Sequence, residues 1–440
     1  MNEETRIRPR ERDTILQALG SGVVPRIGQH HIQVGRSAEL GALLRDIERI
    51  ADGGSAFRLV IGEYGAGKTF FLNLVRSIAL EKRLVTAHAD LNPDRRLHAT
   101  GGQARALYQE LTANLATRSR PDGNGLPNLV ERFVTSALTE ATDDGRSPSA
   151  VIAERLNRLT EHVGGYDFAQ VIDAYWRGHD TGDEQLKHAA LRWLRGEFHT
   201  KTDARQALGV RTIVDDANAY DHLKLLGLFA RLAGFNGLLV ILDELVNLYK
   251  LGSGRARASN YEQILRILND TLGQAQDIGF VMAGTPDFLL DARKGLYSYP
   301  ALQTRLAENP FATGGLVDYT GPVIHLANLT QEDLFLLLQK VCRVQASGSE
   351  EKAPFPDEGI EAFMKHCSER VGDAYFRTPR STIKAFVSLL AVLEQNPGVR
   401  WQKLVEEAEL EAESNPDLEP LDADGHQATP DDDELSTFQL

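Results

Sequence analysis

The spacing of apolar residues along the chain predicts alternating strands and helices, interrupted by one long helical stretch. A buried strand at 57–62 leads into a glycine-rich loop, helical spacing follows over 70–80, and a second strand is predicted at 84–91. Strand, helix and strand in this order form a βαβ unit with parallel strands. Further strands are predicted within 237–244, 277–286 and 321–326. The pattern indicates an α/β fold with a five-stranded parallel sheet flanked by helices.

Helical spacing dominates outside these strands. Residues 100–232 are helical in pattern and far longer than one crossover, which predicts a helical insertion in a core that spans 35–327. Residues 328–409 are predicted to form a helical lid, and Thr330 and Asp333 are spaced as a capping box at its start. Ser37 is predicted to cap a helix at the start of the core.

The two ends of the chain differ from the core in composition. Residues 1–34 combine a basic stretch, a short amphipathic helix around 13–19 and a Gly/Pro-rich connection, which predicts an N-terminal arm. Residues 410–440 are predicted to be an acidic, disordered tail. Nine of the acidic residues behind the net charge of -14 lie in 413–440, so the rest of the chain carries only -14 + 9 = -5. This negative charge argues against a protein that binds nucleic acid over most of its surface, but it is compatible with a local basic groove.

Composition narrows the class of protein further. Hydrophobic residues make up 42% and charged residues 25%, as in ordinary globular proteins, and no apolar run approaches the roughly 20 residues that cross a bilayer. The charged N-terminus has no apolar stretch behind it, so we expect a cytoplasmic protein without a membrane role. Cys342 and Cys367 are too few for a disulfide framework or a zinc cluster.

A phosphate-binding loop is the strongest chemical signal. Residues 62–69, GEYGAGKT, follow a buried strand and precede a helix, which is the context that this motif requires. The glycines let backbone N–H groups point at a phosphate, Lys68 reaches the β- and γ-phosphate oxygens, and the Thr69 hydroxyl binds Mg²⁺. The residues predicted to bind ATP here are Gly62, Glu63, Tyr64, Gly65, Ala66, Gly67, Lys68, Thr69 and Phe70.

Two acidic residues end the third predicted strand. Asp243 and Glu244 follow LLVIL, so a central strand would deliver them to the edge of the sheet where the phosphate loop also lies. We expect Asp243 to hold Mg²⁺, mainly through water, and Glu244 to act as the base that polarises the attacking water. The alternative is a pair of acids in a solvated loop, which the apolar run before them disfavours.

Three further residues are candidate reporters of the γ-phosphate. Thr285 ends the fourth predicted strand and could orient the attacking water, or simply form a Thr-Pro turn. Arg305 follows on a short amphipathic helix and could complete the site of a neighbouring subunit, with Arg293 as a competitor. Its alternative is a surface salt bridge. Arg380 begins a lid helix and could reach the γ-phosphate, with Arg377 as its rival.

The order of these parts resembles an AAA+ ATPase of the origin-recognition and transposition-regulator-like branch. Stretches outside the nucleotide motifs, among them VPRIGQHHIQVGR, ALRWLRGE and TPRSTIKAF, are similar to the BREX-type ATP-binding protein family (BrxD-like). The resemblance runs from about residue 8 to about residue 400. It implies a role in bacterial phage defence beside helicases, and an adenine pocket lined by Val34, Gly35 and Arg36.

The resemblance leaves two functions in view. The first is an oligomeric Mg²⁺-dependent ATPase that acts on DNA with a helicase or another defence protein. Origin-recognition proteins usually carry a winged helix after the lid, and none is predicted here, so DNA contact would need the insertion, the arm or an oligomer channel. The second is a nucleotide-dependent switch, or an infection-sensing NTPase, that regulates a partner protein without touching DNA. Glu244 favours hydrolysis over mere nucleotide binding.

Overall fold

A five-stranded sheet forms the centre of the molecule. The computed structural model describes residues 7–312, 316–347 and 355–406. Every strand pair is parallel, and the strand order is β2-β3-β4-β1-β5. This confirms the predicted five-stranded parallel sheet and places β4 between the strand that precedes the phosphate loop and the strand that ends in Asp243. The strands are β1 (Ser55–Gly62), β2 (Val85–Asp90), β3 (Leu238–Asp243), β4 (Ile278–Gly284) and β5 (Val323–Leu326).

Helices cover both faces of the sheet, which is why β3 and β4 are buried along their whole length and mainly apolar. Val60 of β1 faces one layer and its neighbours Leu59 and Ile61 face the other, as the alternation of side chains along a strand requires. One layer holds α3 (Ser37–Ala51) and α4 (Lys68–Glu81). The other holds α5 (Gln103–Ala113), α11 (Ala219–Leu232) and α13 (Gly254–Gly273).

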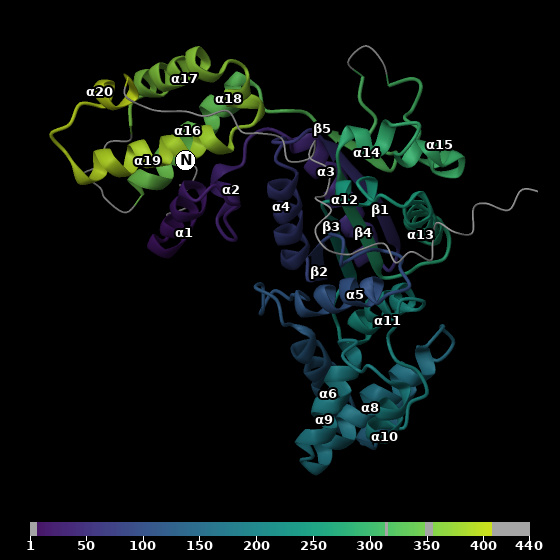
Figure 1. Cartoon of the computed structure of the whole chain (residues 1–440). Helices are drawn as coiled ribbons and strands as arrows, with labels where there is room; N and C mark the ends of the chain where they lie inside the picture. The colour runs from purple at the N-terminus through teal and green to yellow at the C-terminus, as the bar shows by residue number, and fades with distance from the viewer. Residues whose placement is uncertain (1–6, 313–315, 348–354, 407–440) are drawn as a thin grey trace, which may run out of the picture.

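The segment predicted as a helical insertion contains seven helices with two different surroundings. Its first and last members, α5 and α11, pack on the sheet and so belong to the layered core. The five between them form the lobe at the bottom of Figure 1. These are α6 (Leu126–Asp143), α7 (Pro148–Asn157), α8 (Gly165–Thr181), α9 (Glu184–Leu194) and α10 (Lys201–Leu208).

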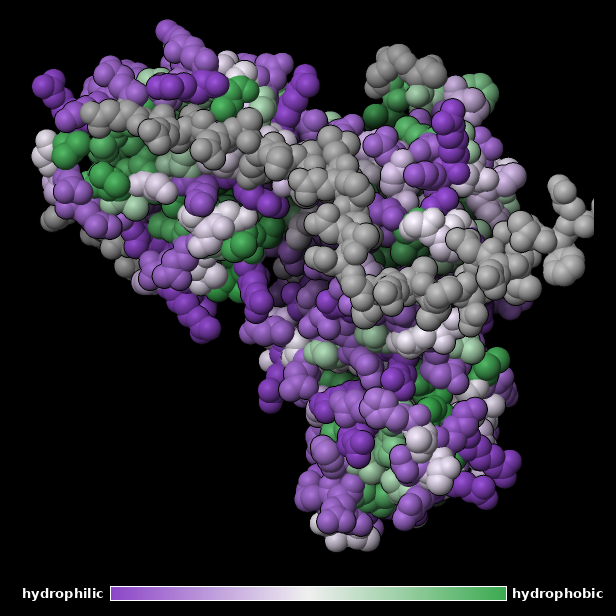
Figure 2. Space-filling model, viewed as in Figure 1, coloured by the Kyte–Doolittle hydropathy of each residue, from purple (hydrophilic) through white to green (hydrophobic). Residues whose placement is uncertain are grey.

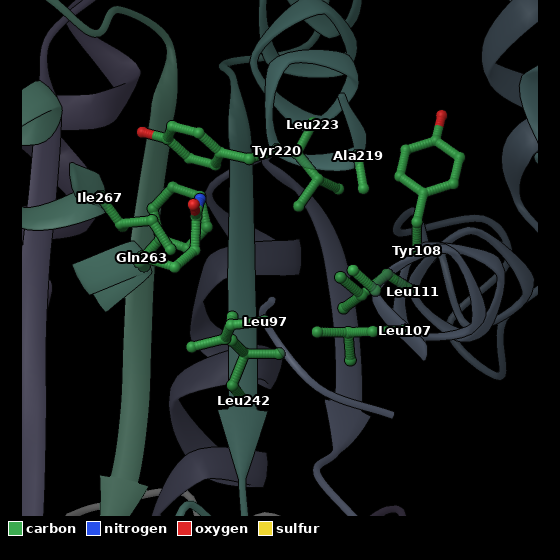
Figure 3. A pocket seen from close by; sticks show the side chains of 12 residues that line it. Leu97, Leu107, Tyr108, Leu111, Ala219, Tyr220, Leu223, Leu242, Gln263 and Ile267 are labelled. Atoms are coloured by element: carbon green, nitrogen blue, oxygen red, sulfur yellow. The ribbon is translucent and has the colours of Figure 1, made fainter. Parts of the chain in front are cut away.

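A small gap remains in the core where α5 and α11 meet β3. Leu107, Tyr108, Leu223 and Leu242 are among its lining residues, and Figure 3 shows the Tyr108 hydroxyl directed away from the leucine side chains. Its volume is about 20 Å³ and its walls are almost wholly apolar. A space of this size and polarity stays dry, so it is a packing defect and not a binding site.

The C-terminal helices, which we call the lid, share an apolar cluster of their own at the upper left of Figure 1. The predicted capping box is confirmed, because the Thr330 side chain accepts from the backbone of Asp333 and the Asp333 side chain accepts from the backbone of Thr330. Figure 2 shows a mainly hydrophilic face, with hydrophobic side chains gathered over this lid. The lid helices are α16 (Gln331–Ala346), α17 (Asp357–Val371), α18 (Ala374–Arg377), α19 (Arg380–Gln395) and α20 (Trp401–Glu406).

The N-terminal arm packs on the lid. It contains α1 (Pro9–Gly20), which begins earlier than the predicted 13–19, and the short α2 (Gln29–Ile32). Ile15 is fully buried in the same apolar cluster as the lid helices α16 and α19. Arg12 donates to the Gln345 carbonyl at 2.9 Å and to Glu394 at 3.0 Å. The arm is therefore part of the lid's hydrophobic core.

Several smaller features complete the fold. Short helices follow β3 and β4, namely α12 (Val246–Tyr249), α14 (Pro286–Leu290), a 3₁₀ turn (Leu296–Ser298) and α15 (Pro300–Leu306). The prediction that Ser37 caps α3 is wrong, because Arg36 occupies the N-cap in a left-handed conformation and Ser37 is already helical. In the parts of the chain that the structure describes, no helix is long and apolar enough to traverse a bilayer. The predicted acidic tail at 410–440 lies outside the described residues.

Candidate nucleotide-binding site

The phosphate loop connects β1 to α4 where the parallel strands have their C-terminal ends. Gly65 and Gly67 have φ values of 81° and 76°, which a residue with a side chain adopts only at a cost. Lys68 Nζ donates to the carbonyl oxygens of Gly62 at 2.9 Å and Glu63 at 3.0 Å. The amine thus lies over the concave side of the loop, at the N-terminus of α4, where backbone N–H groups and the helix dipole favour an anion.

Asp243 meets the phosphate loop directly. Its Oδ2 accepts a hydrogen bond from Thr69 Oγ1 at 2.7 Å, and its Oδ1 accepts from the Glu244 backbone N–H at 2.8 Å. A hydroxyl and a carboxylate brought together in this way supply the hard oxygen donors that Mg²⁺ prefers. The oxygen atoms of Thr69 and Asp243 therefore fit a magnesium ion, and both residues would serve to hold it.

Glu244 has an unusual backbone. Its φ is 59°, in the left-handed region that non-glycine residues rarely adopt, and it is exposed at the C-terminal edge of the sheet. Leu245 N–H donates to the Ala283 carbonyl at 3.1 Å, which ties the turn after Glu244 to the end of β4. Glu244 lines the same cavity as Lys68 and Asp243.

Thr285 lies at the end of β4 and lines the same cavity. It is 7% exposed, and its hydroxyl accepts a hydrogen bond from the Phe288 N–H at 3.4 Å as the N-cap of α14. The local Thr-Pro turn that the sequence also allowed is thus present. Its hydroxyl oxygen caps a helix, and the orientation of an attacking water by Thr285 stays a prediction.

The lid reaches the phosphate loop through the turn between α18 and α19. A Cβ on Gly65 would lie 2.7 Å from the Arg377 carbonyl oxygen and 2.8 Å from Thr378 Cα, so the two backbones are in close contact. Arg380 lines the cavity. The Arg377 side chain lies 3.6 Å from Asp373 in an exposed ion pair. Of the two candidate arginines of the lid, Arg380 lines the cavity and Arg377 does not, and contact of Arg380 with the γ-phosphate stays a prediction.

Arg36 bridges three parts of the site. Its guanidinium donates to the carbonyl oxygens of Ala66 in the phosphate loop and of Ala327 after β5, the latter at 3.3 Å. Burial lowers the pKa of this guanidinium. Val34 packs on the lid cluster and lines the cavity together with Arg36, whereas Gly35 lies beside Asp333. The predicted adenine segment thus borders the cavity through two of its three residues.

Arg305 lies away from this site. It is exposed on α15, where Nε donates to Asn269 Oδ1 at 2.7 Å and Nη1 donates to the Ala301 carbonyl at 3.0 Å. Arg293 is also exposed, and its backbone N–H donates to Asp291 at 2.7 Å. The structure brings neither arginine into the cavity of its own chain, so action on a neighbouring subunit stays a prediction for Arg305.

The cavity holds residues that the sequence did not single out. It has a volume of about 980 Å³, and its wall includes Arg76 of α4 and His88 and Asp90 of β2. Burial, with help from Arg76, lowers the pKa of His88 to about 4. Asp90 lies opposite Asp243 in the register of β2 and β3. Partial burial and then the nearby charge of Asp243 raise the pKa of Asp90. The signal for Asp90 was present, because it ends a strand parallel to β3.

These features define a nucleotide-binding protein with a phosphate loop on an α/β core. The comparison with protein families is more specific: the chain belongs to the family described as BREX system ATP-binding protein BrxC/D, whose model matches residues 7–409. This confirms the resemblance noted from the sequence. The family's description states that its members bind ATP and work in BREX systems. No match to the chain is found among the curated proteins.

Proposed function

We propose that the protein hydrolyses ATP with the help of Mg²⁺, in a core of the AAA+ type. The observation that carries this proposal is the 2.7 Å hydrogen bond from Thr69 to Asp243, because it joins the phosphate loop to the carboxylate at the end of β3. Glu244 follows Asp243 directly and lines the same cavity. Bound there, the metal would neutralise phosphate charge that develops during transfer.

Each side chain then has a distinct task. Lys68 binds the β- and γ-phosphates, and in doing so it gives up its hydrogen bonds to the carbonyl oxygens of Gly62 and Glu63. Glu244 polarises the attacking water, and Arg380 links the γ-phosphate to the lid. Val34 and Arg36 border the adenine. The close contact between Gly65 and the turn at Thr378 supports this coupling, since phosphates that bind the loop also meet the lid.

The site assignment is tested by substitutions that separate binding from turnover. Lys68→Ala should abolish ATP binding, measured with a fluorescent ATP analogue. Glu244→Gln should bind the analogue as tightly as the native protein and lose at least about 10²-fold in turnover, the lower range for removing a general base. Glu262→Gln is the matched control, since it makes the same change at an exposed acid on α13 that does not line the cavity. Normal hydrolysis by Glu244→Gln would refute the assigned base.

We further propose that the protein assembles with itself and that Arg305 completes the site of the next subunit. Its exposed guanidinium, oriented by Asn269 and Ala301, supports this role. Mixing Arg305→Ala with Lys68→Ala subunits should restore activity that neither variant has alone, because some junctions then hold one intact site and one intact arginine. Arg293→Ala mixed in the same way is the control. No restoration in either mixture would leave Arg305 a structural residue.

Family membership supports a role in phage defence, and we propose that the ATPase acts there on DNA with a helicase or another defence protein. The alternative is a nucleotide-dependent switch that regulates a partner without touching DNA. One observation favours that alternative: Arg118 pairs with Glu81 at 3.1 Å and Arg155 pairs with Glu140, so these two arginines near or in the insertion lobe are already neutralised.

The two roles differ in their response to DNA. ATP turnover should be measured with and without single-stranded and double-stranded DNA, and particle mass should be measured in parallel with a slowly hydrolysed ATP analogue. Stimulation by DNA together with assembly selects the DNA-directed ATPase. Unchanged turnover in the presence of both DNAs selects the switch.

A further inference from the structure

A cluster of metal-binding side chains lies in the N-terminal arm. It consists of Glu11 on α1 and the neighbouring His30 and His31 on α2, and one ligand atom from each lies within 4.8 Å of the other two. His31 Nε2 lies 3.7 Å from Glu11 Oε2, and the two imidazole centroids are 3.9 Å apart. Two nitrogen donors and one carboxylate oxygen thus converge from two separate helices.

The backbone holds these groups together before any ligand arrives. Gly28 is left-handed, with φ of 77°, and a Cβ there would lie 2.6 Å from Ile15 Cδ1 and 3.0 Å from Glu11 Cγ. Only glycine permits this approach of α2 to α1. Gln29, which is 3% exposed, donates to the Pro25 carbonyl at 2.8 Å and fixes the start of α2. The side chains of Glu11 and His31 are only 23% and 12% exposed.

We propose that Glu11, His30 and His31 bind a zinc ion, as a site separate from the nucleotide cavity and independent of ATP hydrolysis. Zinc takes imidazole nitrogen and carboxylate oxygen at about 2.0 to 2.2 Å in a tetrahedral arrangement, which separates two ligand atoms by roughly 3.4 Å. The 3.7 Å between His31 and Glu11 is already close to that value. Three protein ligands leave the fourth position to water.

The position of the site gives the ion a structural task. Glu11 belongs to α1, which packs on the lid, and the histidines immediately precede the segment of Val34 and Arg36 that borders the nucleotide cavity. A zinc ion at this junction would join α1 to α2, which both pack on the lid, and would brace the start of the segment that borders the cavity. The competing arrangement is an ion pair between protonated His31 and Glu11, which needs no metal.

The test uses the full-length protein stripped with a chelator and then dialysed. Calorimetric titration with Zn²⁺ should show one ion bound per chain, and Co²⁺ should give the intense visible absorption of a four-coordinate ion. Glu11→Gln and His31→Gln should each weaken binding at least about tenfold, since each removes a ligand. His162→Gln, an exposed histidine outside the cluster, is the matched control and should bind as the native protein does.

Folding is checked separately from binding. Glu11→Gln preserves the size of the side chain, so its thermal midpoint in chelator should equal that of the native protein, and only the native midpoint should rise when Zn²⁺ is added. Two results would overturn the proposal. One is the absence of a saturable single site, and the other is equal Zn²⁺ affinity in Glu11→Gln, His31→Gln and the native chain.

Discussion

Replacing Gly65 by alanine should open the contact between the phosphate loop and the lid. The new Cβ would lie 2.7 Å from the Arg377 carbonyl oxygen and 2.9 Å from Thr378 Cγ2. The lid turn must therefore retreat by roughly 0.7 Å before these atoms reach an ordinary van der Waals separation. The φ of 81° adds a second cost, because alanine tolerates the left-handed region poorly.

The two costs have different sizes and can be separated. The left-handed conformation costs alanine about 1 to 2 kcal/mol, and overpacking costs about 1 to 3 kcal/mol. Gly182→Ala isolates the first, since Gly182 has φ of 75° and a Cβ there would meet nothing within 4 Å. We expect Gly65→Ala to destabilise the protein by about 2 to 5 kcal/mol, the sum of the two costs, and Gly182→Ala by only about 1 to 2 kcal/mol.

Urea unfolding gives the two free energies, and hydrogen exchange of the peptide around Thr378 reports the lid. Gly65→Ala should accelerate exchange there, whereas Gly182→Ala should leave it unchanged, because Gly182 lies in the insertion lobe. The reasoning is refuted if the two variants lose equal stability and both retain native exchange in the lid. In that case the close approach of Gly65 to the lid turn would not exist in solution.

Three further predictions concern single residues. Glu244→Gly should raise stability by up to about 1 kcal/mol in urea unfolding while ATP turnover falls, because glycine relieves the φ of 59°; lower stability would contradict this. Burial lowers the pKa of His222 to about 4, so the folded protein favours the neutral imidazole. The free energy of unfolding is therefore highest above pH 6.5 and falls as the pH drops from 6.5 to 4. His222→Phe should therefore flatten the dependence of unfolding free energy on pH by up to about 1.4 kcal/mol per unit between pH 6 and 5, and parallel curves would refute it. Asp46→Asn should cost about 3 to 5 kcal/mol in the same assay, because it removes the negative charge that pairs with the buried Arg58 and leaves neutral acceptors such as the Gly321 carbonyl; a loss below about 1 kcal/mol would show that neutral acceptors suffice.

The parts of the molecule that local pattern determines were predictable from the sequence. The strand before Gly62 is mostly apolar, with Arg58 as its one charged residue, and the loop and helix after it follow from glycine spacing and helical periodicity. Parallel strands end at one edge, so the meeting of Thr69 and Asp243 was expected as well. The same rule would have added Asp90, which ends β2 in register with Asp243.

Other features depend on which surfaces meet, and pattern does not carry that information. The apolar face around Ile15 shows that α1 must be buried but not that its partners are lid helices more than three hundred residues away. The left-handed turn at Arg36 moved the helix start by one residue and made the predicted cap at Ser37 wrong. The bonds from Arg36 to Ala66 and Ala327 depend on the same tertiary arrangement.

The packing of α1 on the lid has a consequence during synthesis of the chain. Some 360 residues separate Gly20 from Arg380, so the apolar side of α1 leaves the ribosome long before α19 exists. At about 5 to 20 residues per second, this interval lasts roughly 20 to 70 s. During most of that time α1 lacks both of the lid helices, α16 and α19, on which it packs in the folded protein. The nascent chain thus exposes the apolar side of α1 until these lid helices are synthesised, and a chaperone that binds this side would protect the chain from aggregation.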